Sequence, residues 1–315
     1  MRTFNHRMIK WAGNIRPIVS IVKWSRGFIL PGCDGVPLYD VTRFFWSGIT
    51  KGSIGLRASA FSFNFFLSLF PAIIFFFTII PYIPIPHFQD TLMKTMQDII
   101  PDRAFQTIQS TLFDVIKQPH GGLLSLGFVL AMYFSTNGIN SLILAFNQSI
   151  HQQETRPWHI QQVVAILLVV IMSVLLIIAI ALITLGPPLL RYLVEYGFLK
   201  NNITFYFIGF IRWIVIIGMF LFAFSFLYYI APAGQSKFRF ISAGSTLSTF
   251  ITIVASIAFN YYVNNFSKYN TLYGSIGTLM IIMIWINFNS FVVLIGFELN
   301  ASIRGAKKFL KKGIK

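Results

Sequence analysis

Acidic residues, histidine and cysteine are scarce in this chain. Its 315 residues include nine acidic residues, five histidines and one cysteine, Cys33. A single cysteine excludes an intrachain disulfide and a cysteine metal cluster, and we expect Cys33 to be a free cytosolic thiol. His151 and His159 flank Glu154, but in a stretch that we interpret as a short exposed turn, and no histidine has a carboxylate pair at ligand spacing. We therefore predict no metal, no cofactor and no catalytic residue.

Two sequence motifs are also absent. The chain contains no glycine-rich phosphate-binding loop, so we expect no ATP hydrolysis, and any active transport would use an ion gradient or a partner. Residues 1–30 lack a compact apolar core followed by a small-residue cleavage site, which is why we expect no secretory signal peptide.

Long apolar runs, in contrast, dominate the chain. Each of them reaches the ~20 residues that a helix needs to cross the ~30 Å hydrocarbon core of a bilayer. The six runs are 58–82, 122–146, 163–186, 205–230, 240–263 and 275–302. We therefore predict an all-α, polytopic integral membrane protein with six transmembrane helices. In the third run, Gly186-Pro187-Pro188 is expected to end the helix.

The distribution of lysine and arginine predicts the orientation of these helices. Six crossings place both termini on one side, and that side carries 18 basic residues against six on the other. The positive-inside rule therefore predicts that both termini are cytoplasmic. The formal charge of +16 could instead indicate a nucleic-acid partner. Topology and anionic lipid headgroups already account for the one-sided charge, so we expect membrane lipids as partners and no specific nucleic acid.

Three regions follow from this topology. Residues 1–56 are predicted to be a cytoplasmic, amphipathic segment at the membrane surface, with a short amphipathic stretch at 38–51. Residues 57–303 form the six-helix transmembrane domain, and 304–315 form a basic cytoplasmic tail. The extracytoplasmic loop 87–121 contains two amphipathic helices, 88–100 and 102–117, that either cover a cavity or lie on the membrane.

A few polar residues lie inside the apolar runs, where hydrocarbon penalises them. Asn137 and Asn140 share a face of the second crossing. Asn287 and Glu298 share a stripe of the sixth, about 16 Å apart at ~1.5 Å per residue, and Glu298 is the only acid within a crossing. We predict that these four residues line a substrate pathway. Glu298 is equally consistent with a packing anchor.

Other polar residues lie near the ends of the crossings. At the cytoplasmic end, Arg57 or Arg239 is a candidate ion-pair partner of Glu298. The candidates for the outer mouth of the pathway are Arg212, Tyr269, Asn270 and Tyr273. Arg212 alternatively extends outward to the lipid headgroups. Small residues along the fifth crossing, including Gly244, predict close helix packing there.

Three stretches resemble a known family. Residues 57–71, RASAFSFNFFLSLFP, and residues 265–277, NFSKYNTLYGSIG, followed by GFELNA at 296–301, are similar to signatures of the BrkB/YihY family of bacterial inner-membrane proteins. The resemblance spans about 57–303. It implies six helices, cytoplasmic termini and an inner-membrane location. Members of the family have been labelled both ribonuclease BN and virulence factor.

The function that we expect is transport or accommodation of a lipid-like, amphiphilic envelope molecule through a polar groove inside the membrane. A non-transporting scaffold that maintains the envelope is the alternative. A ribonuclease would need a general acid and base, or metal ligands, near a phosphodiester. All five histidines lie outside the crossings, so we predict no enzyme activity.

Overall fold

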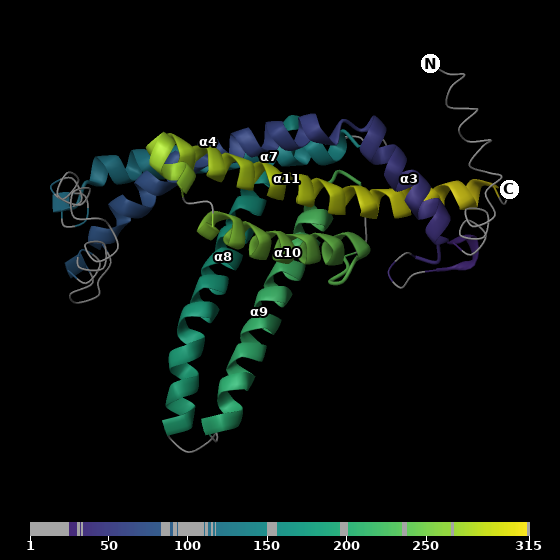
Figure 1. Ribbon diagram of the computed structural model, residues 1–315. Helices are drawn as coiled ribbons and strands as arrows, with labels where there is room; N and C mark the ends of the chain where they lie inside the picture. The colour runs from purple at the N-terminus through teal and green to yellow at the C-terminus, as the bar shows by residue number, and fades with distance from the viewer. Residues whose placement is uncertain are drawn as a thin grey trace.

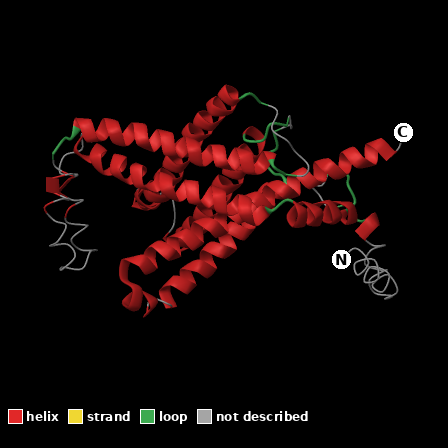
Figure 2. Cartoon of the chain, turned by 90° about the horizontal axis from the view of Figure 1, so that it is seen from above, coloured by secondary structure: helices red, strands yellow, loops and turns green. Residues whose placement is uncertain are grey.

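The structure is a computed structural model in which helix is the regular structure throughout the described chain. It describes residues 25–29, 32, 34–82, 89–90, 93, 110, 113–114, 116, 118–149, 156–195, 201–234, 238–265 and 268–313. Residues 1–24 of the predicted amphipathic segment and most of the loop 87–121, including its two predicted helices, lie outside these residues. Figure 2 shows long helices joined by short loops.

The helices follow the apolar runs of the sequence. Their bounds are α3 Leu38–Lys51, α4 Ile54–Ile79, η1 Ile80–Tyr82, α7 Gly121–Asn147, α8 Trp158–Glu195, α9 Asn201–Ile230, α10 Ala243–Asn265 and α11 Lys268–Gly313. Among the described residues, six helices are long and apolar enough to cross a membrane, from α4 and α7 through to α11. The prediction of six long apolar helices is confirmed. The orientation of the termini stays a prediction.

Helices α8 and α11 extend furthest beyond the predicted bounds. Helix α8 continues through Gly186, Pro187 and Pro188 to Glu195, so the expectation that this sequence ends the helix was wrong. Proline removes a backbone donor, but its fixed φ near −65° is itself helical, so the chain can continue with fewer hydrogen bonds. Helix α11 begins at Lys268, seven residues before the predicted start of the sixth run at 275, and extends to Gly313.

The helices form a closed circuit of neighbours. Helix α4 packs along α7, then α7 against α8, α8 against α9, α9 against α10 and α10 against α11, which returns to α4. In Figure 1, α4, α7 and α11 run across the molecule while α8 and α9 leave this layer as a long hairpin. Helix α3 packs against α11 near its C-terminal end. This circuit brings the first and last crossings into direct contact.

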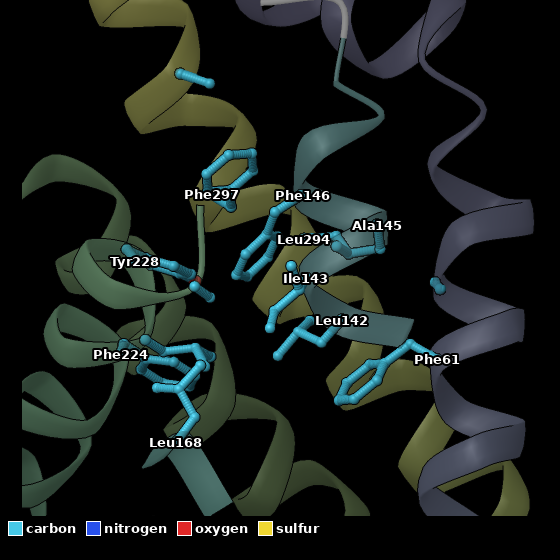
Figure 3. Packing of buried hydrophobic residues seen from close by; sticks show 14 of the residues in the cluster. Phe61, Leu142, Ile143, Ala145, Phe146, Leu168, Phe224, Tyr228, Leu294 and Phe297 are labelled. Carbon is cyan, nitrogen blue, oxygen red and sulfur yellow. The ribbon is translucent and has the colours of Figure 1, made fainter. Parts of the chain in front are cut away.

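An aromatic core joins the helices where α7, α9 and α11 meet (Figure 3). The rings of Phe146 and Phe297 stack with centroids 4.2 Å apart, and both side chains are fully buried. Tyr228 of α9 meets the ring of Phe146 edge-on. Phe61 of α4 and Leu168 of α8 complete the same cluster. Most of the outward helix surfaces are apolar and exposed, as expected for helices that face lipid.

Helices α10 and α11 approach closely at two glycines. A Cβ added to Gly244 would lie 2.1 Å from the carbonyl oxygen of Gly296, so only glycine allows this contact. The backbone N–H of Gly244 donates a hydrogen bond to Asn300 Oδ1 at 2.8 Å. Ser245 and Ser248 of α10 are fully buried beside this contact. The small residues of the fifth crossing therefore serve helix packing.

Candidate functional site

The most buried charges of the described chain lie between α4, α11 and the end of α7. The carboxylate of Glu298 is fully buried and lies 3.5 Å from Nη2 of Arg57, which is 4% exposed. Ser149, just after α7, donates a hydrogen bond to Glu298 Oε1 at 3.0 Å. Arg57 Nη1 donates to the carbonyl of Ala145 on α7 at 2.6 Å. Of the two predicted partners, Arg57 therefore pairs with Glu298.

Two glycines on the α3 side make room for this ion pair. A Cβ on Gly48 would lie 2.1 Å from Glu298 Oε1, and one on Gly52 would lie 2.8 Å from Arg57 Nη2. The four-residue spacing of Gly48 and Gly52 places both near one face of the chain, which lets α3 pack against α11 beside the ion pair. Neither glycine nor Ser149 was predicted from the sequence, although the Gly-x-x-x-Gly spacing is visible in it.

The surroundings of Glu298 are closed. Its side chain has no exposed surface and its charge is balanced by Arg57, so the pair joins α4 to α11 rather than facing an open groove. Leaving either charge alone in this interior would be strongly unfavourable, because a buried charge without its partner loses both water and its counter-ion. The arrangement suits a structural anchor at this point.

Asn287 lies in a different environment, which we call the α4–α11 groove. This is a cavity of about 610 Å³ lined by Ser59, Ser62, Phe63, Asn287, Phe288 and Phe291, among others. Asn287 Nδ2 donates to Ser62 Oγ at 3.1 Å and lies 3.4 Å from Ser59 Oγ. These three polar side chains stand together among apolar walls.

The stripe that joins Asn287 to Glu298 along α11 is not continuously polar. Phe291 and Leu294 occupy the two intervening positions, and Leu294 is 1% exposed. The structure therefore places Asn287 in the α4–α11 groove and Glu298 in the closed interior. A second cavity of about 440 Å³ lies on the other side of the α4–α11 contact and includes Asn289.

The remaining pathway candidates lie on α7. Asn140 Nδ2 donates to Gln162 Oε1 of α8 at 2.7 Å, and Gln161 Nε2 lies 3.5 Å from Asn140 Oδ1. Asn137 is half-buried one turn away. Asn140 thus links α7 to α8, away from the α4–α11 groove. The predicted outer-mouth residues Arg212, Tyr269, Asn270 and Tyr273 lie in α9 and α11, but their side chains fall outside the described residues.

A third cavity, which we call the basic cavity, has a volume of about 270 Å³ and was not predicted. Its lining includes Asp34, Arg239, Asn300, Arg304 and Lys307. Asp34 accepts hydrogen bonds from Arg239 and, at 3.2 Å, from Lys307. Burial alone would raise the pKa of Asp34, but these two cations outweigh it and hold the pKa below its usual value. Arg239 therefore pairs with Asp34 and not with Glu298.

The sequence matches a family model and several curated proteins. The model described as "Virulence factor BrkB" matches residues 45–313. A putative ribonuclease-like protein, YfkH, of Bacillus subtilis is 30% identical over 252 residues, which cover 80% of this chain and 90% of that protein. A UPF0761 membrane protein of Idiomarina loihiensis is 29% identical over 130 residues, covering 39% of this chain and 45% of the relative. No solved structure gives a significant match.

Proposed function

Because this chain belongs to the virulence factor BrkB family of membrane proteins, we propose that it accommodates a lipid-like envelope molecule in the α4–α11 groove and lets it cross the bilayer. In this proposal the protein lies in a bacterial inner membrane with both termini in the cytoplasm. The observation that carries the proposal is the group of Asn287, Ser59 and Ser62 within an otherwise apolar cavity between two candidate membrane spans.

The walls of the groove suit an amphiphile. Phe63, Ile284 and Phe288 line the groove and keep 44–65% of their surface exposed, so an acyl chain can pack against them. The amide and hydroxyl groups beside them offer hydrogen bonds to a polar group that would otherwise have no partner in hydrocarbon. A purely apolar ligand would gain nothing from these groups, and a hydrophilic solute would not need the phenylalanines.

Lipid movement in proteoliposomes tests this proposal. Labelled phospholipid or glycolipid in the outer leaflet is quenched by a membrane-impermeant reagent, and the rate at which inner-leaflet label becomes accessible is measured. Asn287→Leu removes the amide at similar volume and should lower this rate. Asn289→Leu makes the same change on α11 in the other cavity and should leave it unchanged. The proposal is wrong if well-folded wild type moves neither the phospholipid nor the glycolipid. It is also wrong if Asn287→Leu moves lipid at the same rate as wild type.

The closed Glu298–Arg57 pair favours a second candidate function, a scaffold that transports nothing. The Glu298–Arg57 pair connects α11, α4 and, through Ala145, α7, and Glu298 faces no groove, as a stabilising anchor would. A scaffold predicts that Glu298→Gln lowers only the stability of the protein, and that no lipid moves in the assay above. In neither case do we propose a ribonuclease, and purified protein is expected to release no product from labelled RNA.

A further inference from the structure

The basic cavity brings together three segments that are far apart in the sequence. Asp34 precedes α3, Arg239 lies in the α9–α10 connection, and Lys307 lies near the C-terminal end of α11. One carboxylate is shared by two cations, since Asp34 Oδ1 is paired with Arg239 and Oδ2 with Lys307. The Arg239 and Lys307 side chains are 47% and 41% exposed, whereas Asp34 is only 17% exposed.

Arg239 and Lys307 together carry more N–H donors than the single carboxylate of Asp34 can accept from. A guanidinium carries five N–H donors in a planar fork and an ammonium carries three. A phosphate group offers more acceptor oxygens than a carboxylate and pairs with arginine in the same bidentate manner. Asn300 and Ser242 also line the cavity and add uncharged hydrogen-bonding groups. The chemistry of the cavity therefore matches a phosphate.

The backbone of Arg239 is held in place by contacts that do not involve Asp34. The carbonyl of Phe240 accepts a hydrogen bond from Ser225 of α9 at 2.6 Å. Phe238 packs edge-on against Tyr229 of α9, with ring centroids 5.4 Å apart. These contacts on either side of Arg239 fix its backbone to α9. The Arg239 side chain therefore starts from a fixed point beside the cavity, from which its guanidinium can reach an incoming anion as well as the carboxylate.

The apolar residues around Arg239 indicate a lipid. Tyr229, Phe238, Phe240 and Ile241 are 41–66% exposed. They lie where the candidate membrane span of α9 ends at Ile230 and before that of α10 begins at Ala243. Exposed aromatic residues and cations at the ends of membrane spans are typical of the headgroup layer. A free phosphate would use the cations but would leave these apolar side chains without a role.

We propose that the basic cavity binds the phosphate group of an anionic membrane lipid, which takes the place of the Asp34 carboxylate between Arg239 and Lys307. The acyl chains then lie over Phe240 and Ile241. The basic cavity shares no lining residue with the α4–α11 groove. The inference therefore goes beyond the proposed transport and stands or falls independently of it.

Native mass spectrometry of the purified full chain in an uncharged detergent tests the proposal. The protein is offered equal amounts of phosphatidylglycerol and phosphatidylcholine, and the bound lipid is identified. Wild type should retain phosphatidylglycerol preferentially. Arg239→Gln and Lys307→Gln should weaken this binding about tenfold each, as expected for the loss of a charge-assisted contact. Lys308→Gln, which removes a neighbouring exposed cation outside the cavity, should have no effect.

Asp34→Asn separates loss of binding from loss of folding. This variant removes the competing carboxylate, so phosphatidylglycerol binding should rise about tenfold, and a misfolded protein would not show such a gain. Unchanged or weaker binding would refute the displacement of Asp34. An equal loss with Lys308→Gln would show that the attraction is diffuse and would refute the site. If millimolar inorganic phosphate displaces phosphatidylglycerol in full, the ligand is a soluble phosphate and the lipid assignment is wrong.

Discussion

Replacing Gly296 with alanine is expected to separate α10 from α11. A Cβ at this position would lie 1.9 Å from Ser248 Oγ, 2.5 Å from Tyr228 Oη and 2.7 Å from the carbonyl oxygen of Gly244. Ordinary contact begins near 3.4 Å, so the serine hydroxyl would have to retreat by about 1.5 Å. The carbonyl of Gly244 belongs to the backbone of α10 and can retreat only if the helix moves.

The two hydroxyl groups cannot move without losing hydrogen bonds. Tyr228 Oη and Ser248 Oγ lie 2.7 Å apart, and they bond to the carbonyls of Val293 and Val292 at 2.8 Å and 3.1 Å. The two hydroxyl protons make two hydrogen bonds at a time within this group; losing them costs about 1 kcal/mol each, and overpacking adds about 1–3 kcal/mol. Alanine regains about 1 kcal/mol through its higher helix propensity. We therefore expect Gly296→Ala to lower the free energy of unfolding by about 2–4 kcal/mol.

Unfolding in mixed micelles, followed by circular dichroism as the denaturing detergent increases, measures this loss. Gly218→Ala is the matched control, because Gly218 lies inside α9 and an added Cβ meets nothing within 4 Å. The control should be neutral or more stable by up to about 1 kcal/mol. If Gly296→Ala were as stable as this control, α10 and α11 would not approach each other as closely as described.

Three further predictions concern the two charged clusters. Arg57→Met should lower the free energy of unfolding by about 3–5 kcal/mol in the same assay because it leaves Glu298 buried without a counter-ion. The double variant with Glu298→Met should recover most of this loss, and a double variant as unstable as Arg57→Met would contradict the pairing. Gly48→Ala should destabilise by about 1–3 kcal/mol because its Cβ would lie 2.1 Å from Glu298 Oε1; a stability equal to wild type would show that α3 can retreat freely. The lowered pKa of Asp34 means that its ion pairs stabilise the fold above the usual carboxyl value of 3.8 and stop doing so as the pH falls through the lowered pKa. The thermal midpoint of wild type should thus exceed that of Asp34→Asn at pH 7, and a difference that persists undiminished under strongly acidic conditions would refute this origin.

The sequence predicted the number and type of helices because every crossing is an apolar run longer than a bilayer requires. It did not predict all their ends. Pro187 and Pro188 were interpreted as a helix stop, yet proline has helical φ, and α8 continues past them. Lys268 to Gly274 is polar enough to suggest a loop, but it forms the first turns of α11. The polarity of the residues therefore indicates where a helix leaves the hydrocarbon core. It is a less reliable sign of where the helix itself ends.

The sites were harder to predict than the helices because they depend on which helices are neighbours. Arg57 and Arg239 were equivalent partners for Glu298 in the sequence, since both lie at the start of a crossing. Only the contact of α4 with α11 selects Arg57. The basic cavity joins Asp34 to Lys307, which are 273 residues apart, and no local pattern reveals such a contact. The apolar Phe291 and Leu294 within the stripe on α11 are visible in the sequence, but the closure of the surroundings of Glu298 is not.

The length of α11 has a mechanical consequence. At about 1.5 Å per residue, an unbroken helix of 46 residues is roughly 69 Å long, whereas a bilayer with its headgroups measures about 40–45 Å. The helix must therefore tilt or project, and its inclination changes with the thickness of the membrane around it. Asn287, Glu298 and Lys307 all lie on this one rod. A change in the tilt of α11 would move all three residues together. The α4–α11 groove, the buried ion pair and the basic cavity would then all respond to the thickness of the bilayer.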